Sequence, residues 1–270
     1  MKKDLLIIVR GGGDLATGII YRLKKAGFDA LVLETTKPAA IRRQVSFCEA
    51  VYTGNWKVED MEAVRIEKPE DCFRVFEEGK IPVLIDPEGT AIKTLKPDIV
   101  VDAIIAKRNL GTTIDMAPMT VAVGPGFEAG KDVTCVVESM RGHNLGRIFW
   151  EGCALPDTKT PGNIGGYTKE RVIHAAAEGM VEATKEIGDW VEPGDVMGYI
   201  VNGEERTPIL ATIPGFIRGL IREGYQVTKG FKIADIDPRS GEWKNCFTIS
   251  DKSRSIGGSV LEVVSGYARL

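Results

Sequence analysis

The sequence lacks the residue patterns of two common stabilising sites, disulfide bridges and zinc centres. Its five cysteines are widely scattered, no Cys-x-x-Cys pair occurs, and His143 and His174 are the only histidines. An odd number of scattered cysteines argues against a disulfide framework, and two histidines so far apart do not give the spacing of zinc ligands. We therefore expect reduced, mostly buried thiols and no metal site.

Long apolar runs and an excess of one charge are also missing. No run approaches 18 apolar residues, and no apolar segment with a cleavage site follows the initial Met-Lys-Lys-Asp, so we expect a cytoplasmic protein without a membrane span. The net charge of −3 gives no indication of a nucleic-acid partner. Hydrophobic residues make up 43% of the 270 positions, which permits a sizeable core in one large or two smaller domains.

What the sequence does contain, near its start, is the succession of a strand, a glycine turn and a helix. Residues 5–9 are all apolar, three glycines follow at 11–13, and apolar positions recur at helical spacing over 15–26. In this context the pattern Gly-x-Gly-x-x-Ala at 11–16 is typical of a dinucleotide-binding fold, in which backbone N–H groups and the helix N-terminus hold a diphosphate. The predicted cofactor-binding residues here are Gly11, Gly12, Gly13, Asp14 and Ala16, with Gly11, Gly13 and Ala16 against the phosphates. Asp14 could instead cap the helix or exclude a phosphate.

Two further groups near this turn are candidate ligand contacts. Glu34 ends the apolar segment 30–33, at the distance from Gly13 where an acidic residue accepts from a ribose hydroxyl in dinucleotide folds. It could equally be a solvated residue at a strand end. Arg42 and Arg43 could grip a phosphate or form an exposed helix face.

Apolar segments at 82–85, 99–105, 119–123 and 133–137 alternate with short helical or loop segments, which predicts a wound α/β sheet. If these strands are parallel, the loops that follow them lie at one edge together with the glycine turn. That edge would hold an anionic small molecule, with contacts from Lys107, Arg108, Gly124, Gly126 and Arg141. If some strands are antiparallel, the loops are scattered. His143 is a weak candidate for acid–base chemistry.

The second half of the chain contains an internal repeat. After a connection over 155–167 that is rich in proline and glycine, residues 175–200 match residues 211–236 without a gap, at an offset of 36. Pairs such as Gly179 with Gly215 and Ile200 with Ile236 recur at this offset. Two copies are too few for a solenoid, so we expect a pseudo-twofold unit of short strands.

The repeat resembles the biotinyl/lipoyl-type barrel-sandwich hybrid. In carrier domains of that family the modified lysine lies in the hairpin between the halves. Here the hairpin 201–208 has no lysine, and Glu204 stands at the expected place, so a carrier function is not supported. We expect a Rossmann-like wound sheet at 1–154, a small all-β barrel-sandwich domain at 168–240, and a C-terminal segment at 241–270 whose helix packs back on a core.

Two aspartates near an arginine, in the segment Asp235-Ile-Asp-Pro-Arg239, could hold a metal or a substrate, or form an ion-pair cluster. Together with other segments they resemble the accessory proteins of selenium-dependent molybdenum hydroxylases, of the YqeB type. The segments that carry this resemblance are Arg10–Gly18, Ile41–Arg43, Val101–Asn109, Gly124–Phe127, Arg141–Arg147, Asp235–Arg239 and Ile249–Lys252. The resemblance implies a protein that helps to mature a molybdenum hydroxylase of the xanthine dehydrogenase class.

Three hypotheses follow. In the first, the chain is an accessory protein whose Rossmann-like domain binds a nucleotide or the pterin-dinucleotide form of molybdenum cofactor and whose partner is the hydroxylase; we also expect a homo-oligomer. In the second, it is an NAD(P)-dependent oxidoreductase or a selenium- or sulfur-handling transferase, with His143 as acid or base and Cys135 or Cys246 as the thiol. In the third, it is an interaction scaffold without a ligand.

Overall fold

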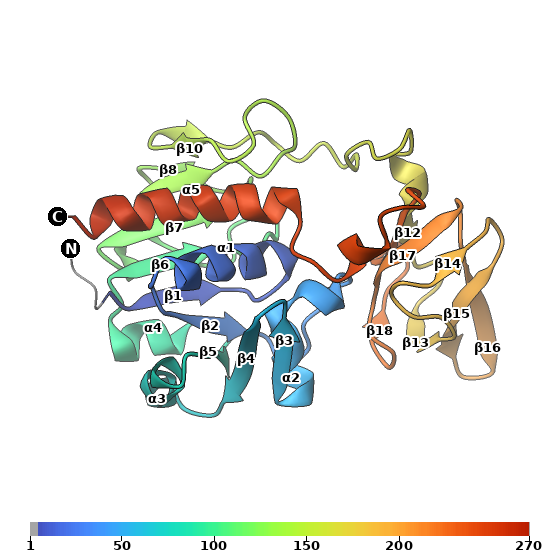
Figure 1. The fold of residues 1–270 in the computed structure, drawn as a ribbon, viewed down its shortest axis with the longest axis horizontal. Coiled ribbons are helices and arrows are strands. Elements are labelled where there is room, and N and C mark those ends of the chain that lie inside the picture. The colour runs from blue at the N-terminus through green and yellow to red at the C-terminus, as the bar shows by residue number, and fades with distance from the viewer. Residues whose placement is uncertain (1–4, 270) are drawn as a thin grey trace. The chain divides into compact units, whose positions relative to one another are not determined.

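The computed structural model describes residues 5–269, which divide into two compact units (Figure 1). Unit 1 comprises the described residues up to Pro38, together with Ser46–Asp157 and the described residues from Ile249 onward. Unit 2 comprises Ala39–Val45 and Thr158–Thr248. Each unit is therefore built from segments that are far apart in the sequence.

Unit 1 is organised around a nine-stranded sheet with the order β10-β9-β7-β6-β1-β2-β5-β4-β3. The strands from β9 to β4 in this order pair in parallel, with Ile7 opposite Ala30 on one side and Ile99 on the other. The strands are β1 (Ile7–Arg10), β2 (Ala30–Glu34), β3 (Asn55–Val58), β4 (Met61–Ile66), β5 (Ile81–Ile85), β6 (Ile99–Asp102), β7 (Met119–Val123), β9 (Cys135–Val137) and β10 (Ile148–Phe149). A separate two-stranded ladder joins β8 (Glu128–Ala129) and β11 (Gly152–Cys153).

Helices cover both faces of this sheet. The short helices α3 (Cys72–Glu77) and α4 (Thr90–Leu95) pack against the side chains of Ile8, Leu31 and Val100. The long helices α1 (Asp14–Lys25) and α5 (Asp251–Tyr267) lie side by side in Figure 1, and a fifth helix is α2 (Ala50–Thr53). No helix among residues 5–269 is long and apolar enough to cross a membrane.

The prediction of a Rossmann-like wound sheet is wrong. The sheet is mixed, because β3 and β10 are antiparallel to their neighbours at its two edges. The connections from β6 to β7 and from β7 to β9 contain no α-helix, whereas crossover helices define a wound sheet. Helix α5, from the end of the chain, contacts β7 and β9 instead. A distant segment thus supplies the cover that local crossovers would have provided.

Unit 2 contains two four-stranded antiparallel sheets, with the orders β12-β19-β17-β14 and β16-β15-β13-β18. A single apolar core that includes Val181, Ile200, Ile217 and Ile236 joins them. The strands are β12 (Val172–His174), β13 (Gly179–Ala183), β14 (Trp190–Val191), β15 (Val196–Asn202), β16 (Glu205–Leu210), β17 (Gly215–Leu220), β18 (Gln226–Val227) and β19 (Lys232–Asp237).

The sequence repeat recurs in the strand pairing. Val181 pairs with Ile200 in the first copy, and Ile217 pairs with Ile236 in the second. The copies exchange their short middle strands, because β14 of the first copy pairs with β17 and β18 of the second pairs with β13. Each sheet therefore contains strands of both copies, and neither copy could complete its sheet alone.

The prediction of a barrel-sandwich hybrid is also wrong, because the two four-stranded sheets are separate and no ladder between described strands closes them into a barrel. Edge strands remain at β12, β14, β16 and β18. The repeat correctly indicated short strands in two copies. Closure depends on hydrogen bonds between the sheets, and a periodic pattern of apolar residues and glycines does not encode these.

Candidate functional site

The carboxyl edge of the parallel strands in unit 1 is the place where several predicted site residues meet. A Cβ atom at Gly11 would lie 3.0 Å from the Ala103 carbonyl oxygen, so the loops after β1 and β6 touch. A Cβ at Gly126 would lie 2.6 Å from Cα of Arg108, and one at Gly124 would lie 2.6 Å from Oγ of Ser139. The loops after β1, β6, β7 and β9 therefore form one continuous surface, as parallel strands require.

The three glycines of the first loop play different roles. Gly11 has a φ of +94° and no room for a side chain, so the fold itself requires glycine there. A Cβ at Gly12 would lie 3.0 Å from the backbone nitrogen of Cys48, so a larger residue would crowd this segment. The Gly12 N–H donates to Oε2 of Glu34 at 2.8 Å. Gly13 differs from both, because no atom lies within 4 Å of its Cβ position and its φ of −71° suits any residue.

Gly13 is the N-cap of α1, and a glycine has no side chain with which to cap this helix end. The first backbone N–H groups of an α-helix have no partner within the helix, and the helix dipole favours an anion there. Asp14 follows Gly13, and its Oδ1 accepts from the hydroxyl of Ser253 in the first turn of α5 at 2.9 Å. The open position at Gly13 therefore lies beside the beginnings of α1 and α5.

Four inward carboxylates hold the loops at this edge, each at or directly after a strand end. Both oxygens of Glu34 accept backbone N–H bonds, from Gly12 and Thr35. The other three carboxylates also accept backbone N–H bonds: Asp86 from the first turn of α4, Asp102 from Ile104, and Glu138 from Met140 and Leu155. Burial raises the pKa of Glu34 and of Asp102 above the usual range, although these hydrogen bonds act in the opposite direction.

Sequence reasoning missed three of these four carboxylates. Asp86, Asp102 and Glu138 each stand at the end of a buried apolar run, as Glu34 does. That shared position is the signal that could have identified them. Their role is to organise the loops, because each is bonded to the backbone of its own or a following segment.

A buried arginine lies under the glycine loop. Arg10, the last residue of β1, is 4% exposed, and its Nη1 donates to the hydroxyl of Thr112 at 2.5 Å. The Thr112 hydroxyl donates in turn to Oδ2 of Asp102, also at 2.5 Å. Arg10 and Asp102 are 4.0 Å apart, so the threonine hydroxyl bridges the two charges. This bridge ties the loop 103–112 to β1 and β6.

The loop after β6 carries backbone strain. Ile105 and Lys107 have φ values of +60° and +61°, a conformation that is unusual for any side chain and especially for a β-branched one. Such strain persists only where the surroundings impose it, and it is common at functional sites. Lys107 and Arg108 are exposed here, and Nζ of Lys107 lies 2.8 Å from Asp157.

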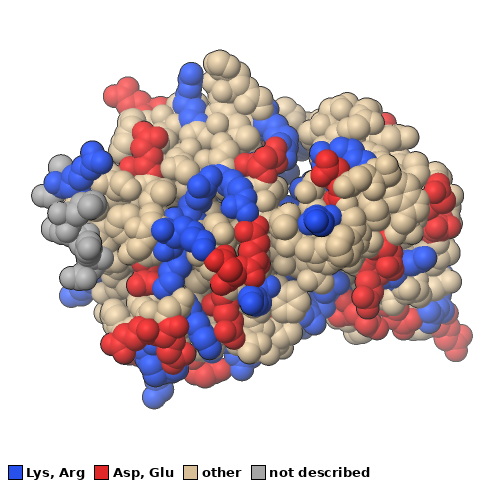
Figure 2. Space-filling view, in the orientation of Figure 1, with Lys and Arg blue, Asp and Glu red and all other residues tan. Residues whose placement is uncertain are grey.

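The loop after β9 brings Arg141 to α5. Its guanidinium makes two hydrogen bonds to Asp251, at 2.7 and 2.8 Å, and both side chains are accessible to solvent. His143 is exposed two residues further along. On the face drawn in Figure 2, basic side chains of the described residues are interspersed with acidic ones, so attraction of an anion would depend on local groups.

Two predicted contacts, Arg42 and Arg43, belong to unit 2. Arg42 is 6% exposed and donates from Nη2 to the carbonyl oxygens of Asn245 and Thr248. Nε of Arg43 donates to the carbonyl oxygen of Leu220 at 2.8 Å. Both guanidiniums bind the backbone of unit 2, which is a structural role that adjacent arginines in a sequence do not reveal.

The thiols proposed for an enzyme are poorly suited to nucleophilic chemistry. Burial raises the pKa of Cys135 to about 12 and that of Cys246 to about 11, so both remain protonated at neutral pH. Cys246 also lies in unit 2. Across residues 5–269, no group of three or more His, Cys, Asp and Glu side chains could hold a metal ion.

The chain resembles a curated protein from Escherichia coli strain K12, "Uncharacterized protein YqeB". The two are 46% identical over 259 residues, which cover 96% of this chain and 47% of that protein. The chain thus spans about half the length of this relative. No protein-family model matches the chain. The similarity supports the YqeB part of the resemblance noted from the motifs.

Similar solved structures include two described as desuccinylase or aspartoacylase proteins. One is a succinylglutamate desuccinylase/aspartoacylase from Rhodobacter sphaeroides, 14% identical, which matches over 86% of this chain and 84% of its own with a TM-score of 0.26. The other is an aspartoacylase family protein from Mesorhizobium loti, also 14% identical, over 87% and 86%, with a TM-score of 0.28.

Proposed function

We propose that this chain is an accessory protein that helps to mature a selenium-dependent molybdenum hydroxylase, and that its unit 1 binds a phosphate-bearing cofactor. The cofactor would be a nucleotide or the pterin-dinucleotide form of molybdenum cofactor. The motif resemblance and the similarity to YqeB support the role in maturation. The geometry at Gly13 supports the binding.

The observation that carries the binding proposal is the open Cβ position of Gly13. Neither its backbone conformation nor its neighbours require glycine, since a side chain would meet no atom within 4 Å and φ is −71°. A phosphate needs that space, because it must approach the backbone N–H groups at the start of α1. Gly11 and Gly12 are less suited to this contact, because both pack against the chain itself.

The other predicted contacts fit around this position in different ways. Arg141 could shift from Asp251 to a phosphate, because both side chains of this ion pair are accessible to solvent. Glu34 already accepts from Gly12 and Thr35, yet a carboxylate has about four acceptor positions and could still accept from a ribose hydroxyl. Lys107 and Arg108 would add positive charge from the strained loop.

A Gly13→Ser variant tests the binding. Serine is a better N-cap than glycine, so we expect the ligand-free protein to keep its stability or gain a few tenths of a kcal/mol. The serine side chain would occupy the phosphate position, so stabilisation by the ligand should disappear. Differential scanning fluorimetry with NAD(P)H, ATP, CTP, GTP and pterin cofactor would measure both effects. If no compound stabilises the wild type, or if the variant still binds, this site is not the one.

The maturation role needs a separate measurement. We expect cells that lack this protein to produce a hydroxylase with less bound molybdenum cofactor, and wild-type protein to restore it. Gly13→Ser should fail to restore it, although the variant accumulates to the same level. Full restoration by Gly13→Ser would separate maturation from binding at Gly13, and unchanged cofactor content in the deletion strain would contradict the maturation role itself.

A further inference from the structure

The sequence repeat relates the two sheets of unit 2, so their outward faces can be compared position by position. We name each sheet by a central strand, the β15 sheet (β16-β15-β13-β18) and the β19 sheet (β12-β19-β17-β14). Met180 pairs with Val201 in the β15 sheet. Their equivalents 36 residues later, Phe216 and Asp237, pair in the β19 sheet. Val201 and Asp237 each directly follow a core residue, and successive strand residues point to opposite faces, so both pairs lie on the outward faces.

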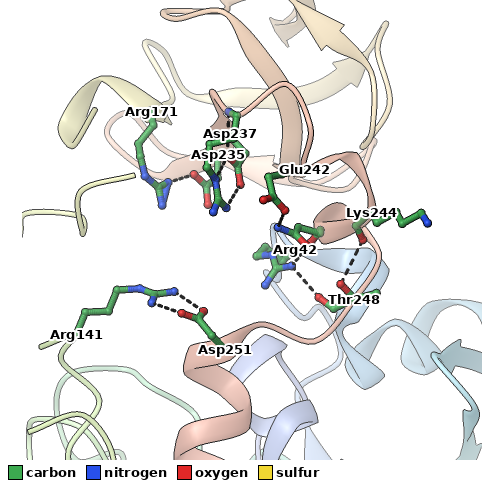
Figure 3. Close-up of polar contacts among 11 residues, drawn as sticks. Arg42, Arg141, Arg171, Asp235, Asp237, Glu242, Lys244, Thr248 and Asp251 are labelled. Atoms are coloured by element: carbon green, nitrogen blue, oxygen red, sulfur yellow. Dashed lines mark hydrogen bonds and ion pairs between the residues drawn. The ribbon is translucent and has the colours of Figure 1, made fainter. Parts of the chain in front are cut away.

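The outward face of the β19 sheet is covered by other segments of the chain. Asp235 and Asp237, both on this face, are only 5% and 1% exposed. Arg171, which precedes β12, forms a buried ion pair with Asp235, as Figure 3 shows. Gly219 pairs with Asp235, and a Cβ there would lie 3.2 Å from the carbonyl oxygen of Ile41. One of the two equivalent faces therefore packs against further segments of polypeptide.

The equivalent face of the β15 sheet is open to solvent and more apolar. Met180 is 49% exposed, and Tyr199 and Val201 are partly exposed. Tyr199 and Val201 occupy the positions at which the β19 sheet has Asp235 and Asp237. The covered face thus carries the buried charges and the open face carries apolar side chains, which is the reverse of the usual distribution. Exposed apolar surface of this kind marks an interaction site.

We call this open surface the outer β15 face, and its residues are Met180, Glu182, Tyr199, Val201, Arg206 and Pro208. Its charges are one acid and one base. Nη2 of Arg206 lies 2.8 Å from Oε2 of Glu182, and the guanidinium lies over the ring of Tyr199. The side chains of Arg206 and Glu182 are 50% and 45% exposed, so both are accessible to a partner.

This charge arrangement is complementary to itself. A two-fold interface joins the same patch of two copies, so a contact between two different residues occurs twice. One acid and one base on the patch therefore permit two ion pairs, each from Arg206 of one copy to Glu182 of the other. A second copy of this chain is the partner that such a patch fits.

Pro208 opposes the alternative in which a second copy extends the sheet. β16 is an edge strand, and a proline in it has no backbone N–H to donate to another strand. We propose that two copies of this chain associate face to face through their outer β15 faces, with Met180 and Val201 near the centre of the contact. Methionine, tyrosine and arginine, which this face carries, are enriched in protein interfaces. The interface belongs to unit 2, so the proposal is independent of the phosphate site at Gly13.

Sedimentation velocity of the full chain over a concentration series tests this association. We expect the wild type to shift from monomer to dimer as its concentration rises. Met180→Glu changes a half-exposed side chain and should fold normally, and it should weaken association by about tenfold or more, because two-fold symmetry buries the new charge twice. Phe73→Glu is the matched control. Phe73 is 51% exposed on α3 of unit 1, and this variant should associate as the wild type does.

A charge exchange tests the pairing between copies. Glu182→Arg and Arg206→Glu each place like charges across the proposed interface, so each variant alone should associate more weakly than the wild type. Mixed in equal amounts, the two variants should associate with each other, because each arginine of one copy then meets a glutamate of the other. The like charges within each chain persist in the mixture, so recovery on mixing reports a contact between copies. Lys131→Glu, which breaks an exposed ion pair with Glu128 in unit 1, should leave association unchanged.

Three results would overturn the proposal. The first is a wild type that stays monomeric throughout the series, which would point to a different protein as the occupant of this face. The second is a Met180→Glu variant that associates as the wild type does. The third is a mixture in which the two charge variants, each shown to be folded by thermal unfolding, do not associate with each other. Gly13→Ser should associate normally, because its site belongs to unit 1.

Discussion

The Glu34 carboxylate and the Gly12 backbone N–H are joined by a hydrogen bond of 2.8 Å, and this bond closes the glycine loop from inside the protein. Burial raises the pKa of Glu34, so the folded state holds its proton to a higher pH than the unfolded chain does. In that pH interval the folded state binds more protons, and stability falls as the pH rises.

This fall in stability with rising pH can be tested by comparing the wild type with Glu34→Gln. As the pH rises from the unfolded pKa through the raised folded pKa, the wild type should lose stability relative to the variant, because only the wild type must ionise a buried carboxyl. Urea denaturation of both proteins over a pH series measures the difference. Glu88→Gln, which removes an exposed carboxylate, is the matched control. A difference that stays constant with pH would contradict the effect of burial on Glu34.

Because α1 packs closely against α5 at Gly18, we expect a side chain at this position to destabilise the protein. A Cβ there would lie 2.5 Å from Cβ of Ser253, and one at Gly257 would lie 2.5 Å from the carbonyl oxygen of Gly18. We expect Gly18→Ala to lower the free energy of unfolding by about 1–3 kcal/mol, because the helices must move apart. Gly258→Ala, in α5 with no atom near its Cβ position, should instead stabilise by up to about 1 kcal/mol. Denaturant unfolding that gives both variants the same sign would contradict this packing.

Because the Thr112 hydroxyl links Arg10 to Asp102, we expect the stability of the protein to depend on this hydroxyl. Thr112→Val keeps the shape of the side chain but leaves the buried charges of Arg10 and Asp102 without their shared partner. We expect a loss of about 1–3 kcal/mol in unfolding free energy, or more because the partners are charged. Thr112→Ser keeps the hydroxyl and should cost less. Equal stability of the two variants, measured by denaturant unfolding, would show that the hydroxyl contributes little.

Thiol reactivity provides a test of the nucleophile hypothesis. Cys135 is fully buried and its pKa is raised to about 12, whereas Cys153 is exposed on β11. At neutral pH we expect iodoacetamide to label Cys153 in the native protein and to leave Cys135 unmodified until the protein unfolds. Peptide mass spectrometry after timed labelling measures this order. Rapid labelling of Cys135 in the native protein would contradict this prediction and support Cys135 as a reactive thiol.

Part of this structure could be predicted from local patterns. The strand, glycine turn and helix at 7–25 follow from an apolar run, three glycines and helical spacing, all within 20 residues. The parallel arrangement of β1, β6, β7 and β9 also brings the loops with Lys107, Gly124 and Arg141 to one edge, as expected. Whether these residues bind a ligand stays a prediction.

Other features depended on partners that are distant in the sequence. Arg42 and Arg43 looked like phosphate ligands because they follow β2, but the backbone around Asn245 and Leu220 binds them. The sheet lacks crossover helices beside β7 and β9 because α5, more than 100 residues later, contacts those strands. Whether unit 2 forms a closed barrel or two open sheets depended on hydrogen bonds between the two sheets.

The sequence by itself determined the local conformations, since apolar periodicity, the glycine positions and the offset of 36 residues act over short distances. It determined that Gly11 would be a turn and that two copies of a β unit would form. Only the tertiary structure decided which side chains these elements would meet. In the folded protein Glu34 accepts a hydrogen bond from Gly12, Arg42 binds the backbone of unit 2, and no atom lies near the Cβ position of Gly13 at the start of α1. The physical reason is that burial and hydrogen-bond partners are set by segments that meet only when the chain folds.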